Sequence, residues 1–191
     1  MDCEGGRLHQ PELCRIAHGV YRATVSDLEA ILKELAGSGA LYLVVGGVAV
    51  VLHGHPRFTA DLDLAVRLER DNVLRLLAAL ESLGYKPRAP VAAVDFADEN
   101  LRNEWIREKG LTVFSMWSSR YPATEIDLFV REPFDFDAAY ARSLRVDLDG
   151  AIVTVAAIPD LITLKKAAGR PHDLEDVIAL EAIARAADDE D

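Results

Sequence analysis

The stretch that most constrains the fold of this chain runs from Leu43 to Val66 and reads LVVGGVAVVLHGHPRFTADLDLAV. Its first apolar residues predict a buried strand at 41–45, and the pair Gly46-Gly47 then turns the chain into a short apolar helix at 47–53. The alternation in DLDLAV predicts a second strand at 61–66. A strand, a glycine turn, a short helix and a second strand therefore bring an acidic strand back beside the turn.

Two aspartates on the second predicted strand point to chemistry. Asp61 and Asp63 are spaced i, i+2, so their side chains share one face of the strand, with Cα atoms about 6.5–7 Å apart. A third, Asp127, interrupts the apolar run EIDLFV, where an unpaired carboxylate is costly unless a cation or metal compensates it. Carboxylate oxygens suit Mg²⁺, and free backbone N–H groups at a glycine turn suit phosphate. The pattern predicts metal-assisted chemistry on a nucleotide, with Glu125 as a weaker fourth acid.

Composition limits the class of protein. The chain has 191 residues, of which 50% are hydrophobic, enough for one globular core. The net charge of −11 argues against long-range attraction of the whole chain to nucleic acid or anionic membrane. No apolar run is long enough to span a bilayer, and the first residues do not resemble a signal peptide, so we expect a cytoplasmic protein with no membrane partner. Cys3 and Cys14 are expected to be free thiols.

The remaining pattern predicts an α+β protein with a mixed β-sheet, flanking helices and a short C-terminal helical annex. We expect a core at 26–157 and a helical pair with an acidic tail at 158–191, and make no structural prediction for 1–25. Ser26 and Glu29 form a candidate capping box that would start the first helix. Further helices are predicted at 70–83, 92–109, 134–142, 158–168 and 172–186, and hairpins at 111–130 and, through Asp149-Gly150, at 143–156.

Single motifs in this chain are weak, but their combination is specific. Gly46-Gly47 fits neither the GxGxxG nor the GxxxxGKS pattern, so neither a dinucleotide fold nor a P-loop is indicated. The five histidines form no metal-binding pattern. Trp105 and Trp117 are expected to be packing residues rather than base-stacking residues. The specific feature is the order of these motifs along the chain. A strand is followed by Gly-Gly, by a short helix and R-x-T-x-D-x-D, and later by a strand with one central aspartate.

This series, GG…RFTADLDL followed by IDL, resembles the nucleotidyltransferase superfamily related to DNA polymerase β. The string DLITLKKAAGRPHDLEDV at 160–177 is similar to the ending of a small AbiEii-like bacterial branch of that superfamily. The likeness extends from about Leu41 to Leu180 and is weakest over 85–110. Toxins of that branch are longer and carry a larger helical C-terminal domain, a departure that bears on any toxin role.

The resemblance implies a role for each of these positions. Gly46 and Gly47 would cradle a nucleoside triphosphate, with Asp127 as the base toward the acceptor hydroxyl. Lys165, at the edge of an apolar helix face, would extend its ammonium to the triphosphate, and Arg57 would do the same or brace its loop. Mg²⁺ or Mn²⁺ would be held by Asp61, Asp63 and Asp127, with supporting positions at Thr59, Glu125, Arg170 and Asp173. Strand parity and the cost of burying unpaired charge lead us to expect the three aspartates on adjacent strands, with their carboxylates within about 4–6 Å of one another.

The implied activity is transfer of NMP from an NTP, such as ATP, to the hydroxyl of an RNA 3′ end or a protein, in a toxin–antitoxin setting with a cognate antitoxin as partner. One alternative is a small-molecule adenylyltransferase of the antibiotic-resistance kind, since its motifs look similar. Another is a catalytically silent nucleotide- or partner-binding module, against which the complete set of three acids argues.

Overall fold

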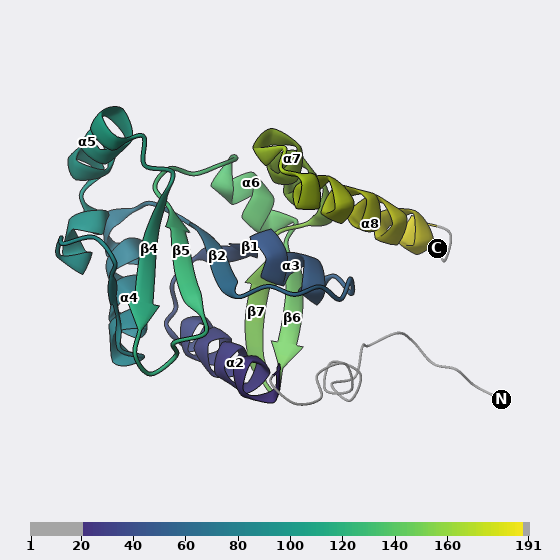
Figure 1. The fold of residues 1–191 in the computed structure, drawn as a ribbon, viewed down its shortest axis with the longest axis horizontal. Coiled ribbons are helices and arrows are strands. Elements are labelled where there is room, and N and C mark those ends of the chain that lie inside the picture. Colours follow the sequence, from purple (N-terminus) through teal and green to yellow (C-terminus); the bar gives the residue numbers. More distant parts are fainter. Residues whose placement is uncertain (1–20, 189–191) are drawn as a thin grey trace.

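The described part of the chain, residues 21–188 of a computed structural model, is built on a mixed sheet with helices on both sides of it (Figure 1). The sheet has seven strands in the order β3-β4-β5-β2-β1-β7-β6. In chain order they are β1 (Tyr42–Val45), β2 (Asp61–Val66), β3 (Tyr85–Pro87), β4 (Val113–Ser118), β5 (Glu125–Phe129), β6 (Leu144–Leu148) and β7 (Ala151–Val155). The predicted α+β class with a mixed sheet is confirmed.

The central strands mix both directions. β1 pairs antiparallel with β2 and parallel with β7, and β2 pairs parallel with β5. The two predicted hairpins, β4–β5 and β6–β7, are both antiparallel pairs. The second turns through Asp149 and Gly150, both with positive φ, as a two-residue turn of this sequence requires. Strand β3 was not predicted, because a three-residue strand ending in proline has no alternation to read.

Eight helical segments are described: α2 (Tyr21–Gly37), α3 (Gly46–Leu52), α4 (Arg70–Ser82), the 3₁₀ segment η1 (Ala93–Ala97), α5 (Glu99–Lys109), α6 (Phe136–Ala141), α7 (Ile158–Ala168) and α8 (Pro171–Asp188). The predicted start at Ser26 is wrong, since α2 already includes Tyr21. The helix predicted over 92–109 is broken at Asp98, which is extended and whose side chain accepts from the N–H groups of Asn100 and Leu101. Cys3 and Cys14 lie outside the described residues.

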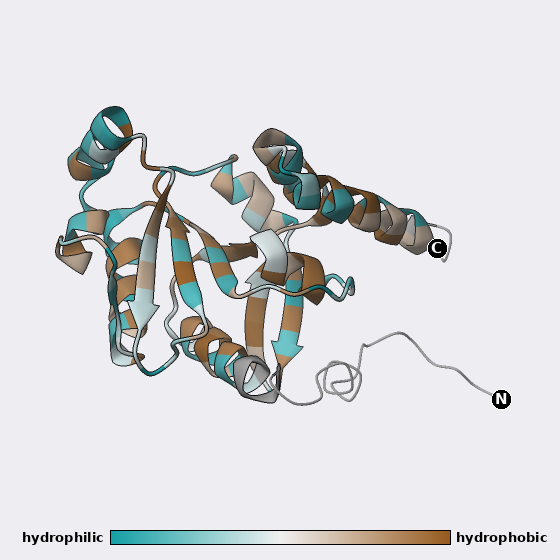
Figure 2. Ribbon diagram, in the orientation of Figure 1, coloured by the Kyte–Doolittle hydropathy of each residue, from teal (hydrophilic) through white to brown (hydrophobic). Residues whose placement is uncertain are grey.

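Apolar and polar residues are distributed unevenly over the strands of the sheet (Figure 2). Strand β1 is buried along its whole length, and helix α3 contacts it. Strands β4 and β5 instead alternate between buried and partly exposed residues, so one of their two faces is open. Helices α7 and α8 pack against each other beside the sheet, and α7 contacts α3 (Figure 1). The open face of β4 and β5 adjoins the start of β2, where the first two aspartates lie. None of the helices between residues 21 and 188 combines the length and the apolar character that spanning a membrane requires.

Candidate active site

The acidic residues of β2 and β5 stand opposite one another. In the parallel ladder Asp63 is paired with Asp127 and Asp61 with Glu125. Residues opposite each other in neighbouring strands point to the same face and are separated by one strand spacing, about 4.8 Å. The alternate residues, among them Leu62 and Ile126, point to the other face and are fully buried. The sequence predicted that the three aspartates lie on adjacent strands and share one face. The strand register places them on one face, together with Glu125.

Gly46 makes room for one of these carboxylates. It follows the last residue of β1, which is paired with Asp63, and its φ of +64° lies in the left-handed region. A Cβ atom on Gly46 would lie 1.9 Å from Oδ2 of Asp63, so no other residue fits. A Cβ on Gly47 would lie 2.5 Å from Oγ1 of Thr59. The glycine pair is therefore required where the chain packs against the acidic strand and the loop before it.

Burial and neighbouring acids raise the pKa values of two carboxylates at this site, Asp63 and Asp127. Burial, followed by the charges of Asp127 and Asp61, raises the pKa of Asp63 to about 6, and Lys165 and Arg170 oppose the rise. Burial likewise raises the pKa of Asp127, against a hydrogen bond from Ser115. The Oδ1 atom of Asp127 is buried and has no hydrogen-bond partner in the described part of the chain. A carboxylate oxygen buried without a donor fits a site that receives a cation.

The carboxylates are nevertheless not converged on one point. Among residues 21–188 no group of three His, Cys, Asp or Glu side chains is close enough to hold a metal ion as it stands. From the sequence, we expected the three carboxylates to lie within about 4–6 Å of one another. The described residues do not show such a cluster. Repulsion between like charges favours side-chain rotamers that separate them. The backbone thus aligns the three residues, and their side chains would have to rotate to bind one ion.

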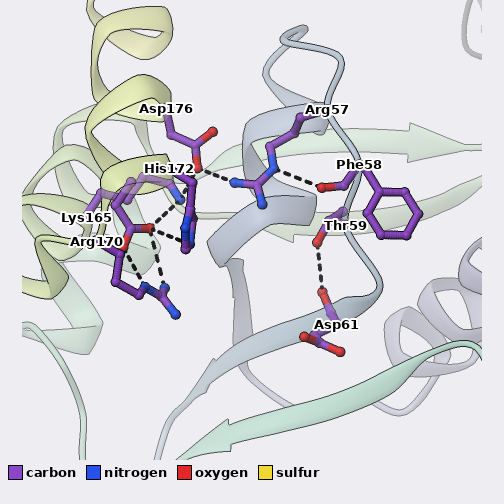
Figure 3. A network of polar contacts seen from close by, with 9 residues as sticks. Arg57, Phe58, Thr59, Asp61, Lys165, Arg170, His172 and Asp176 are labelled. Carbon is purple, nitrogen blue, oxygen red and sulfur yellow. Dashed lines mark hydrogen bonds and ion pairs between the residues drawn. The ribbon is translucent and has the colours of Figure 1, made fainter.

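The C-terminal helices carry a buried network of ion pairs (Figure 3). Lys165 of α7 is only 5% exposed, and its Nζ lies 2.6 Å from Oδ2 of Asp176 and 3.4 Å from Oδ1 of Asp173, both on α8. Asp176 also pairs with the guanidinium of Arg57, and Asp173 accepts from Nε of Arg170 at 2.7 Å. The ammonium that we expected to reach freely toward a cleft is thus held by two carboxylates.

This network joins the annex to the loop that precedes β2. Burial raises the pKa of Asp173, but the hydrogen bond and charge of Arg170, with the charge of Lys165, outweigh it and leave the pKa below its ordinary value. In the same loop as Arg57, the hydroxyl of Thr59 lies 3.4 Å from the carbonyl oxygen of Asp61 (Figure 3). Asp176 was not among the predicted site residues. Its spacing of three from Asp173, which puts both on one helix face, is the signal that could have identified it.

Three further residues beside the acids were also missed. Ser115 of β4 is paired with Asp127, and Arg88 forms an ion pair with Glu125. Trp117 is 44% exposed, which does not support the packing role predicted for it. The prediction holds for Trp105, which is buried and stacks on Phe114 with ring centroids 5.5 Å apart. Strand parity on β4 indicates that Ser115 and Trp117 share one face of the strand. It does not indicate whether that face is the buried or the open one.

A separate hollow of about 670 Å³ lies at the opposite end of β2 and β5. Its walls come from the segments that follow these strands and from α5 and α6, and they include Arg67, Arg102, Glu132 and Asp135. Because β2 and β5 are parallel and the acids stand at their starts, this hollow is distinct from the carboxylate site.

The fold and the aligned carboxylates define a domain of the nucleotidyltransferase type. Residues 23–188 match the family described as "Nucleotidyltransferase of unknown function (DUF6036)", and the chain belongs to that family. None of the curated proteins compared with the chain matches it.

Solved structures share the fold. The lincosamide antibiotic adenylyltransferase LnuA in its lincomycin-bound form superposes with a TM-score of 0.56 at 15% identity, covering 83% of this chain and 96% of its own. ANT(2")-Ia in complex with adenylyl-2"-tobramycin superposes with a TM-score of 0.53 at 15% identity, covering 86% and 96%. An antigenic nucleotidyltransferase-like protein from Paracoccidioides brasiliensis has a TM-score of 0.51 at 19% identity, covering 81% and 75%. At these identities the likeness establishes the fold.

Proposed function

We propose that the protein is a nucleotidyltransferase that moves an NMP group from an NTP, such as ATP, to a hydroxyl of an acceptor. The observation that carries the proposal is the pairing of Asp63 with Asp127 on one open face, directly against a glycine that no other residue can replace. An acidic pair of this kind destabilises the fold unless it serves a bound cation.

The residues present fit a divalent cation, Mg²⁺ or Mn²⁺. The donors are all carboxylate oxygens, and the buried Oδ1 of Asp127 lacks a partner among the described residues. Asp61, Asp63 and Asp127 would hold the ion. When bound, it supplies the charge neutralisation that transfer of a phosphoryl group requires.

The protein residues then have separate tasks. Asp127 accepts the proton of the acceptor hydroxyl, whose oxygen forms the new bond to the α-phosphorus. The bond from the α-phosphorus to the bridging oxygen breaks, and pyrophosphate leaves. The backbone of Gly46 and Gly47 would cradle the triphosphate through its N–H groups. The cations of Arg57, Lys165 and Arg170 lie on the side of the site from which they can offset its charge. Asp173 and Asp176 hold these cations in place.

Two acceptor settings are proposed. The C-terminal string resembles the AbiEii-like branch, which favours an RNA 3′ end or a protein in a toxin–antitoxin pair with a cognate antitoxin. The second candidate, an antibiotic adenylyltransferase, is favoured by the fold shared with LnuA and ANT(2")-Ia over more than 80% of the chain.

The test is a labelling experiment. The full chain is incubated with each NTP, labelled at the α-phosphate, with Mg²⁺ or Mn²⁺ and with a total cell extract. Label is then counted in the RNA, protein and small-molecule fractions. Asp127→Asn should reduce transfer about 10²-fold or more, the usual loss for a general base. Absence of transfer by the wild type, or equal transfer by Asp127→Asn, would contradict the proposal.

A further inference from the structure

The open face of the sheet continues from the acids to an exposed aromatic residue. Asp61 is paired with Glu125, and Lys86 of β3 is paired with Trp117 of β4. Since Met116 is paired with Ile126, Trp117 stands opposite Glu125 in the β4–β5 ladder. One row of side chains thus crosses four strands on one face, with Trp117 two strands, or about 10 Å, from Asp61.

A second row runs beside the first. The backbone N–H of Arg88 donates to the carbonyl of Ser115, Ser115 is paired with Asp127, and Asp127 with Asp63. The row therefore carries Arg88 at its outer end and the reacting carboxylates at its inner end. Both rows lead from the proposed site of transfer to the edge of the sheet.

Trp117 is unusually accessible for its type. On β4 its neighbours Met116 and Ser118 are buried on the opposite face, while Trp117 is 44% exposed. Tryptophan is normally well buried, so an indole left open beside a polar site indicates a surface that another molecule covers. An aromatic face of this kind stacks on nucleobases irrespective of their sequence.

The charges around Trp117 define what it can receive. Lys86 is exposed and has no ion-pair partner among the described residues. Arg88 pairs with Glu125 but is 61% exposed, so further guanidinium N–H groups remain available. Two cations beside one aromatic ring match a base and its adjoining phosphate. They are too few for a long duplex, which the net charge of −11 also disfavours.

We propose that Trp117, Lys86 and Arg88 form an acceptor-end subsite that binds the terminal nucleotide of a single-stranded nucleic acid. The base stacks on Trp117, its phosphate contacts Lys86 and Arg88, and its ribose hydroxyl is directed along the two rows toward Asp127. The inference rests on the proposed function for the transfer step, whereas binding of the strand end can be measured without transfer.

The test is binding of a short single-stranded oligoribonucleotide with a 5′ fluorophore to the full chain, followed by fluorescence anisotropy in the absence of NTP. Trp117→Ala should weaken binding about tenfold or more, the range for loss of one stacked base, and Trp117→Phe should restore most of it. Lys86→Ala should weaken binding and lower the salt dependence by about one charge. Lys109→Ala, an exposed lysine on α5, is the matched control and should bind as the wild type does.

Several outcomes separate this inference from the proposed function. If Trp117→Ala binds as the wild type does, or if Lys109→Ala is equally damaging, the subsite is wrong. If the wild type labels only a protein or a small molecule in the transfer experiment, the subsite is also wrong although the protein remains a nucleotidyltransferase. If the oligonucleotide binds through Trp117 but no NMP is transferred to any fraction, the subsite stands and the proposed function fails.

Discussion

At the scale of single residues, Gly46 and Asp63 depend on each other. The positive φ of Gly46 admits a side chain only with strain, and the space that a side chain would fill is occupied by the Asp63 carboxylate. A side chain at position 46 would therefore lower the stability of the fold in two ways. It would strain the left-handed backbone, and it would clash with the Asp63 carboxylate.

Gly46→Ala tests this pair, and Gly39→Ala is its matched control. Gly39 has nearly the same φ, +69°, but nothing lies within 4 Å of the position that a Cβ atom would take there. Gly39→Ala should lower the free energy of unfolding by about 1–2 kcal/mol, the cost of the left-handed conformation. Gly46→Ala should lower it further and abolish transfer, because Asp63 is displaced. Urea denaturation measures both values, and equal losses in the two variants would show that the contact with Asp63 costs nothing.

The raised pKa of Asp63 predicts a pH-dependent stability. The folded-state pKa of about 6 lies above the ordinary value of 3.8, so the folded chain binds more protons between these values. Its stability without metal should therefore fall as pH rises from about 4 to about 6, by at most about 3 kcal/mol at 1.4 kcal/mol per pKa unit. Asp63→Asn should lack this component, and its advantage over the wild type should grow across that range. Parallel stability curves from urea melts would contradict the assignment.

For single residues, the sequence predicted local properties well and contacts between distant segments poorly. Parity along β2 and β5 predicted which faces the three aspartates share, since alternation is a local property. The aspartates were expected on adjacent strands, but the register that sets Asp63 directly opposite Asp127 was not predictable, because tertiary packing determines it. The exposure of Trp117 was missed for the same reason, as neither face of β4 could be assigned to the core.

At the scale of elements, the C-terminal helices were predicted well and their contacts were not. Helix α7 begins and ends where the sequence pattern indicates, and the left-handed Gly169 ends it. Periodicity shows that Asp173 and Asp176 share a face of α8, but not that this face meets Lys165 and the Arg57 loop. The annex is consequently attached to the core by buried charges as well as by apolar contacts.

Lys165→Ala tests the buried network that joins α7 to α8 and includes the partner of Arg57, with Lys166→Ala as the control. Removal of the buried ammonium leaves two largely buried carboxylates with fewer partners, so stability should fall by up to about 3–5 kcal/mol, the cost of breaking a buried pair. Lys166 pairs with Glu181 at the surface, and its loss should cost less than about 1 kcal/mol. Denaturation curves of the two variants give the comparison. If Lys166→Ala is the more damaging change, the network does not hold the annex in place.

At the scale of the whole molecule, the fold could be predicted because its main signals are local. Hairpin turns, helix periodicity and the glycine turn specify most elements, and their mixture specifies an α+β sheet. The strand order β3-β4-β5-β2-β1-β7-β6 could not be derived, since it depends on pairings between distant segments. Helix α7 contacts α3, and the charges of Lys165 and Arg170 act on Asp63. Under the proposed function, a nucleotide bound at the acids would therefore contact both the core and the annex.

Ligand binding should therefore stabilise the entire described domain in one transition. NTP together with Mg²⁺ should raise the melting temperature of the wild type by several degrees, since a ligand at about 100 times its Kd adds about 2.7 kcal/mol. The shift should be largely lost in Asp63→Asn. It should be kept in Glu175→Gln, which removes an exposed acid of α8 outside the buried network and so controls for the change in net charge. Differential scanning calorimetry with metal alone, NTP alone and both together separates the contributions. Equal shifts in the wild type and Asp63→Asn would exclude Asp63 from the metal and nucleotide site, whereas loss of the shift in Glu175→Gln would mean that it reflects overall charge rather than binding at the paired carboxylates.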